Sequence, residues 1–467
     1  MKKLKFDLMK YLLILGLIMP VASCSEDDPE ETPKRTEKEI TAFSLPALEL
    51  TGIIDPAAYT ITLTVTPDFD QTLLESVAPR IEYKGEKIEP AATEPQNFTR
   101  DVTYKVTAED GSSQDYTVSL TVSEFYATGF AKATEVWTQN WAALGFAASS
   151  EPTMAYLNGK LVASRSGIIL DAATGEPTGT KLNVTGAEGK FNATESLNYP
   201  FSVTNDDAGN VIGVSLGAWT TSFLPVYKWT NSLESPPELV FELNNTTWAG
   251  GNLNRFGRKI SVVGDINGNG YIAQYHQDQG GAGNGDEKQY IWKVTAGVVD
   301  PGTYTAIAAR TGDKSYYQTL IPMTTASIYP YYLAVTGHSS GDPHSEISYK
   351  ANESSEKEVI NGFLENHFSS NWGSYVRHAK KFDFNGVTYL AILSVNSTED
   401  YYLSIMDTRN NEVKEYFVIP KVVTNNNGSS SVTSAAEETL PTGEKKIRLY
   451  TLITDWGVYC HELTSKP

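Results

Sequence analysis

The chain of 467 residues has few cysteines and too few basic side chains to balance its acidic ones. Two cysteines cannot build a disulfide framework. Lys and Arg number 37 against 56 Asp and Glu, which gives a formal net charge of −19 at pH 7. A protein that follows a nucleic-acid backbone needs the opposite balance, so we expect no nucleic-acid partner. Glycine and proline occur at ordinary levels, which argues against a collagen-like or wholly disordered chain.

The apolar run near the N-terminus, Tyr11 to Met19, is too short to span a bilayer stably. Lysines precede it and Val21-Ala22-Ser23-Cys24 follows it, which is the order of parts in a secretory signal peptide. The last four residues resemble a bacterial lipobox. That resemblance implies removal of residues 1–23 and a lipid anchor on Cys24. An ordinary signal peptide that is cleaved nearby is the alternative.

Residues 24–38 are almost wholly polar, and Ser25-Glu26-Asp27-Asp28 comes directly after the cysteine. This composition predicts a flexible, acidic tether. An acidic run at this position resembles the surface-export signal of Bacteroidetes lipoproteins. The resemblance implies an outer-membrane lipoprotein that is exposed at the cell surface.

Residues 39–124 alternate apolar and polar side chains as half-buried strands do, for example in Tyr59 to Val65. Two further alternating segments flank the turn Glu109-Asp110-Gly111-Ser112. Short strands without a helical period predict an immunoglobulin-like β-sandwich. The segment 104–112 with the following Tyr116-Thr117-Val118 resembles the N-terminal module of a family of Bacteroidetes surface lipoproteins, whose larger C-terminal part is uncharacterised.

Residues 125–467 contain a repeat of short strands about 57 residues long, which is typical of four-stranded β-propeller blades. A glycine-rich insert at 278–286 lengthens one copy. The length favours six blades, with seven as the alternative if residues 130–150 add strands. The overall fold class is therefore all-β: an immunoglobulin-like sandwich followed by a β-propeller. Each repeat is marked by an apolar or aromatic residue before a polar one: Leu170-Asp171, Tyr227-Lys228, Trp292-Lys293, Tyr349-Lys350, Met406-Asp407 and Cys460-His461.

The loops between second and third strands and the crossings between blades gather at one face of a propeller. We expect ligand binding there. Aromatic rings stack on the apolar side of sugars while polar groups orient the hydroxyls, so the residues in these loops favour a carbohydrate ligand. For each tryptophan, packing between blades is the alternative. The predicted site residues are Trp219, Trp248, Arg255, His276, His338, Trp372, Tyr375, Arg377 and Trp456.

No motif marks a catalytic nucleophile, and we expect neither a metal nor a cofactor. Asp265, Asn267 and Asn269 have the spacing of calcium ligands, but His276 stands where the loop needs its bidentate Glu, which favours a hairpin turn. Asp400 and Asp455 could form a glycosidase pair, but the sequence does not give their separation. We predict a surface lipoprotein that binds a glycan, with transporter or enzyme components as neighbours. The alternatives are a cell-adhesion or protein-binding lipoprotein and a propeller glycoside hydrolase or lyase.

Overall fold

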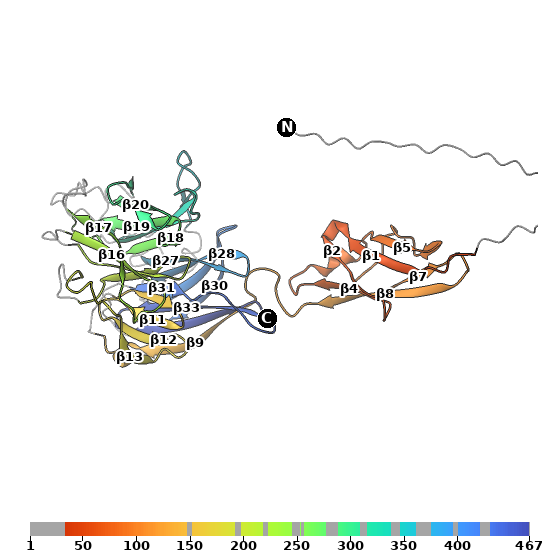
Figure 1. The fold of residues 1–467 in the computed structure, drawn as a ribbon, viewed down its shortest axis with the longest axis horizontal. Helices are drawn as coiled ribbons and strands as arrows, with labels where there is room; N and C mark the ends of the chain where they lie inside the picture. The colour runs from red at the N-terminus through yellow and green to blue at the C-terminus, as the bar shows by residue number, and fades with distance from the viewer. Residues whose placement is uncertain are drawn as a thin grey trace, which may run out of the picture. The chain divides into compact units, whose positions relative to one another are not determined.

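The computed structural model describes residues 33–146, 152–191, 198–217, 223–244, 253, 256–276, 288–308, 315–337, 346–360, 375–395, 400–420 and 430–466. These residues are mainly β-strands, with short 3-10 helices at Pro46–Leu48, Gln71–Leu74 and Trp141–Leu144, so the predicted all-β class is confirmed. They divide into two compact units, one that ends at Val122 and one that begins at Ser123 (Figure 1).

The first unit has two sheets around one apolar core. Strand β4 buries Ile61, Leu63 and Val65, every second residue, as its alternation predicts. Phe43 and Tyr104, which come from different sheets, meet edge to face in the core. One sheet has the order β2 (Leu50–Thr51), β1 (Glu39–Leu45), β5 (Arg80–Lys84); the other has the order β3 (Ile53–Asp55), β4 (Thr60–Val65), β8 (Ser113–Val122), β7 (Val102–Thr107), β6 (Lys87–Glu89).

The described part of the second unit contains six antiparallel sheets. Five are continuous in the sequence. The first has β10 (Met154–Leu157), β11 (Lys160–Ala163), β12 (Ile168–Asp171) and β13 (Pro177–Lys181); the second has β14 (Ser202–Asn205), β15 (Val211–Val214), β16 (Phe223–Trp229) and β17 (Glu238–Asn244). The third has β18 (Ile260–Gly264), β19 (Gly270–His276), β20 (Lys288–Thr295), β21 (Val298–Val299) and β22 (Thr305–Ala308).

The last three sheets follow the same plan. The fourth has β23 (Ser315–Pro322), β24 (Tyr331–Gly337), β25 (Glu346–Lys350) and β26 (Glu358–Val359); the fifth has β27 (Tyr375–Phe384), β28 (Val387–Val395), β29 (Tyr401–Asp407) and β30 (Glu412–Ile419). The sixth has β31 (Ser430–Ser434), β32 (Glu438–Thr439), β33 (Lys445–Ile453), β34 (Gly457–Thr464) and, from the start of the unit, β9 (Lys132–Asn140).

The predicted repeat corresponds to these sheets, because each of its six residue pairs lies in the third strand of one sheet. The turn signals also lie where first and second strands meet. Asn158 and Gly159 have φ values of 48° and 78°, and Asn385 and Gly386 have 45° and 75°. Positive φ at both central residues is the requirement of a type I′ hairpin turn, which Asn-Gly meets at low cost.

The first strands of the six sheets contact one another in chain order, and β31 contacts β10. Hydrogen bonds between the first two of these segments show that residue numbers rise in the same direction along both: Thr153 bonds to Val203, and Tyr156 bonds to Asn205. The strands therefore run in the same direction around a common axis. The turns that follow them gather at one end of the unit, here named the turn end. The second strands therefore end at the opposite end of the unit, here named the loop end.

Strand β9 links the start of the second unit's chain to its last strand. It pairs antiparallel with β34 over Lys132–Asn140. Residues 132–140 thus complete the sixth sheet, and the described residues 130–146 form no separate sheet. Gly457 permits the junction. Its φ is 144°, and a Cβ there would lie 2.0 Å from the carbonyl oxygen of Gln139.

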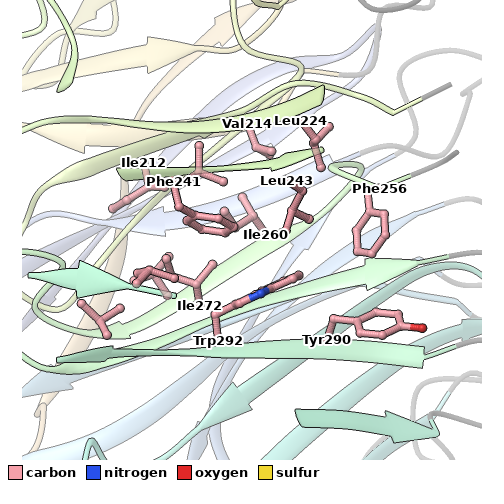
Figure 2. Packing of buried hydrophobic residues seen from close by; sticks show 14 of the residues in the cluster. Ile212, Val214, Leu224, Phe241, Leu243, Phe256, Ile260, Ile272, Tyr290 and Trp292 are labelled. Carbon is pink, nitrogen blue, oxygen red and sulfur yellow. The ribbon is translucent and has the colours of Figure 1, made fainter. Parts of the chain in front are cut away.

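Neighbouring sheets pack through apolar faces. Between the second and third sheets, Figure 2 shows Phe241 and Leu243 of β17 above Ile272 of β19 and Trp292 of β20. The Phe241 and Trp292 rings are 5.4 Å apart. Burying one large side chain contributes about 1.5–3 kcal/mol, so each such interface helps to hold its two sheets together.

Candidate functional site

Most predicted ligand residues fall outside the described part of the chain. This applies to Trp219, Trp248, Arg255, His338 and Trp372, to the side chain of Tyr375, and to the predicted lipidation site Cys24. His276, Arg377 and Trp456 are described.

His276 and Trp456 both lie at the loop end, and both are buried. His276 is 4% exposed, with its ring 4.5 Å from that of Phe256. Trp456 is 2% exposed and meets the Tyr401 ring edge-on at 5.0 Å. The structure does not bring the two residues together, because one packs in the third sheet and the other between the fifth and sixth. Arg377 is half-buried near the start of β27.

Three basic side chains lie along the common axis: Lys259 and His378 are buried, and Lys380 is half-buried. Lys259 donates from its Nζ to the carbonyl oxygen of Ser430 at 2.7 Å, which links the third sheet to the opposite, sixth sheet. Lys380 of the fifth sheet donates to the carbonyl oxygen of Asn205 in the second sheet, which is again opposite. Between the two lysines, His378 accepts the N–H of Val432 at its Nδ1, 3.2 Å away. Burial and both lysine charges hold the pKa of His378 well below its usual range.

A cavity of about 390 Å³ opens at the turn end, next to Lys380, and we name it the axial cavity. Its size falls within the range of about 300–1,000 Å³ that small-ligand pockets occupy. Four sheets contribute to it, because the ends of their first strands converge there. The lining residues are 156–158, 205–209, 230, 380–383, 434–437 and 447.

The acidic wall of the axial cavity is held in place by hydrogen bonds. The carboxylate of Asp206 accepts the N–H and the side-chain amide of Asn210, both at 2.7 Å, and the N–H of Ile266 at 2.9 Å. Burial raises the pKa of Asp206, and these donors act in the opposite direction because they favour the ionised carboxylate. Asp207 accepts the N–H of Gly264 at 2.8 Å and the Nζ of Lys381 at 3.0 Å.

The calcium-like segment forms the turn between β18 and β19, in agreement with the hairpin interpretation. Asp265 accepts the N–H of Asn267 at 2.8 Å, and Asn269 accepts the N–H of Ala296 at 3.2 Å. Within the described ranges, no group of three or more His, Cys, Asp or Glu side chains is arranged to hold a metal ion.

Sequence reasoning missed the axial cavity. Four of its six charged residues come as two adjacent pairs, Asp206-Asp207 directly after the first strand β14 and Lys380-Lys381 in the second half of the first strand β27. These pairs were the available signal, since equivalent repeat positions meet around the axis.

Residues 40–120 match the family model described as SGBP, N-terminal, where SGBP denotes surface glycan-binding protein. Comparison with curated proteins gave no match. Among solved structures, the chain is similar to a DUF4623 family protein from Bacteroides eggerthii, with 17% identity and a TM-score of 0.52 over 92% of this chain and 99% of that one. It is also similar to a protein of unknown function from Dyadobacter fermentans, with 8% identity and a TM-score of 0.40 over 73% and 100% of the two chains.

The family match supports the predicted relation of the first unit to a Bacteroidetes surface family, and it is consistent with carbohydrate binding at the cell surface. The Bacteroides eggerthii protein shares the fold over nearly the whole chain. None of the described residues forms a helix with the length and apolarity that a membrane crossing requires.

Proposed function

We propose that this protein is a lipid-anchored, surface-exposed lipoprotein of the outer membrane that captures a glycan. The match of residues 40–120 to the surface glycan-binding family carries the proposal. Removal of residues 1–23 leaves Cys24 as the anchor, and residues 24–38 form the tether. The glycan is held for transporter or enzyme components at the same surface.

In this proposal residues 39–124 are an immunoglobulin-like spacer and residues 125–467 are a six-bladed β-propeller. The ring of contacts between first strands supports the propeller, as does the pairing of β9 with β34 across the two ends of the unit. The two-sheet core around Phe43 and Tyr104 supports the sandwich.

The loop end is the proposed glycan-binding face. Trp219, Trp248 and Trp372 supply aromatic surfaces there, and Arg377 supplies hydrogen-bond donors. Aromatic stacking contributes about 0.5–1.5 kcal/mol beyond the burial of area, so removing one such ring weakens binding by roughly tenfold when the burial is included.

A glycan array probed with residues 25–467 tests this function. We expect binding to a defined group of glycans, and we expect Trp219→Ala and Trp372→Ala to weaken it while Tyr416→Ala does not. Tyr416 is a suitable control because it is an exposed aromatic residue on the outer strand β30. An array without any bound glycan would refute glycan capture. Release of smaller saccharides from bound glycans would indicate an enzyme.

The anchor is tested separately in cells that carry the full-length gene. We expect metabolic labelling with palmitate in the natural chain and none in Cys24→Ala. Protease added to intact cells should degrade the natural protein. Resistance to that protease would contradict exposure at the surface.

A further inference from the structure

We propose that the axial cavity is a second saccharide site, distinct from the loop end, and that it accepts uncharged sugar units while it excludes sugars that carry a carboxylate. This inference rests on the proposed glycan-binding function. The inference adds a second binding location and a chemical class of ligand to that function.

The charges around the cavity exclude an acidic ligand. The lining has four carboxylates, Asp206, Asp207, Asp383 and Glu437, against two ammonium groups, Lys380 and Lys381, so its formal charge is 2 − 4 = −2. Lys445, which lies outside the lining, pairs with Glu437 at 3.1 Å, and the balance with this group included is still negative, at 3 − 4 = −1. A sugar carboxylate that enters would face this excess of like charge in a partly desolvated site, and such juxtaposition is costly.

Neither lysine is positioned to recruit an anion. The Lys381 ammonium lies 3.0 Å from Asp207 and 3.9 Å from Asp383. Lys380 is bonded to the carbonyl oxygen of Asn205, and the charges of Asp206 and Asp207 act on it directly. Both cations are therefore balanced by groups of the protein itself.

The same walls suit hydroxyl groups. A sugar hydroxyl can donate to a carboxylate and accept from an ammonium, so it can bond to both kinds of group in this wall. A charged ligand group would be repelled by the wall groups of its own sign. The cavity also has an aromatic wall at Tyr156, whose ring is stacked on Tyr450 with centroids 6.1 Å apart and an angle of 9° between the planes. That stacking supports the Tyr156 ring from behind, which favours contact with the apolar side of a sugar.

A divalent cation is a poorer fit than a sugar, despite the negative charge. Both oxygens of Asp206 already accept N–H groups, and Asp207 is bonded to Gly264 and Lys381. The carboxylates act as hydrogen-bond acceptors in the wall, and an ion would have to compete with these donors for them.

The experiment uses residues 25–467 on an array that carries neutral and uronic-acid-containing oligosaccharides side by side. Ala436→Trp fills the cavity mouth from an exposed lining position. Ala326→Trp is the matched control, since Ala326 is exposed in the β23–β24 turn at the same end but does not line the cavity. We expect Ala436→Trp to weaken binding of at least one neutral glycan by about tenfold or more, and Ala326→Trp to leave it unchanged.

A charge variant tests the selectivity. In Asp383→Asn/Glu437→Gln the formal charge of the lining becomes zero, so we expect uronic-acid glycans related to the neutral ligand to gain several-fold in binding. Retention of every neutral glycan by Ala436→Trp would overturn the cavity site, and so would tight binding of acidic glycans that Ala436→Trp removes. An array on which the natural protein binds no glycan at all would instead overturn the proposed function.

Discussion

Acidification should destabilise the second unit through His461, which is buried in β34. The residue is 0% exposed, and its ring lies 4.0 Å from that of Phe417 in the neighbouring fifth sheet. Neither ring nitrogen has a hydrogen-bond partner within the described part of the chain. Burial favours the uncharged ring and lowers the pKa of His461 from 6.5 to about 4.

The size and direction of the effect follow from these two pKa values. Below pH 6.5 the unfolded chain binds a proton at His461, whereas the folded chain binds it only near pH 4. Stability is therefore fully present above about pH 6.5 and is lost as the pH falls toward 4. At about 1.4 kcal/mol per pKa unit, the difference between these two pKa values lowers the free energy of unfolding by about 3 kcal/mol at pH 4.

Urea unfolding at pH 8, 6.5, 5 and 4 measures this loss, with His461→Phe as the comparison. All eight tryptophans lie beyond residue 122, so their fluorescence reports on the second unit alone. At pH 8 we expect the variant to be at least as stable, because phenylalanine needs no hydrogen bond. The gap in its favour should widen by about 3 kcal/mol by pH 4. His378 is present in both proteins, so its contribution cancels in the difference between their unfolding free energies. A gap that stays constant across the pH range would refute the reasoning.

Three further outcomes follow from packing and hydrogen bonding. Gly217→Ala should lower the free energy of unfolding by about 1–3 kcal/mol, because the added Cβ would lie 1.7 Å from the carbonyl oxygen of Leu253. Gly302→Ala is the control: its Cβ would lie 3.4 Å from the nearest atom, so the free energy of unfolding should change by less than about 0.5 kcal/mol. Cys460 is buried and its thiol pKa is raised to about 12, so in residues 25–467 a thiol reagent at pH 8 should label it only after urea is added. Asp206→Ala should lower stability by about 1–3 kcal/mol for each buried N–H that loses its acceptor, as urea unfolding would detect.

The repeat could be predicted from the sequence because its signals are local. An Asn-Gly pair such as Asn385-Gly386 indicates a hairpin turn because both residues adopt positive φ angles easily. A third strand such as β29 can be recognised from its apolar residues. The number of sheets was harder to predict, since residues 130–150 could have formed a sheet of their own. Their strand β9 instead pairs with β34, more than 300 residues away in the chain, and only closure of the unit decides that pairing.

The two ends of the second unit differ in how far sequence reasoning could reach. At the loop end, residue type indicated position along the repeat but not exposure. His276 and Trp456 lie near the expected end, yet both are buried, His276 against Phe256 and Trp456 against Tyr401 of the neighbouring sheet. At the turn end, the axial cavity depends on Lys380 meeting Asn205, which is 175 positions away. No spacing rule links those two residues until the strands are placed around one axis. A buried ammonium is costly unless it is paired, so lysines in or beside the first strands, such as Lys259 and Lys380, are the sequence feature from which such an axis could be inferred.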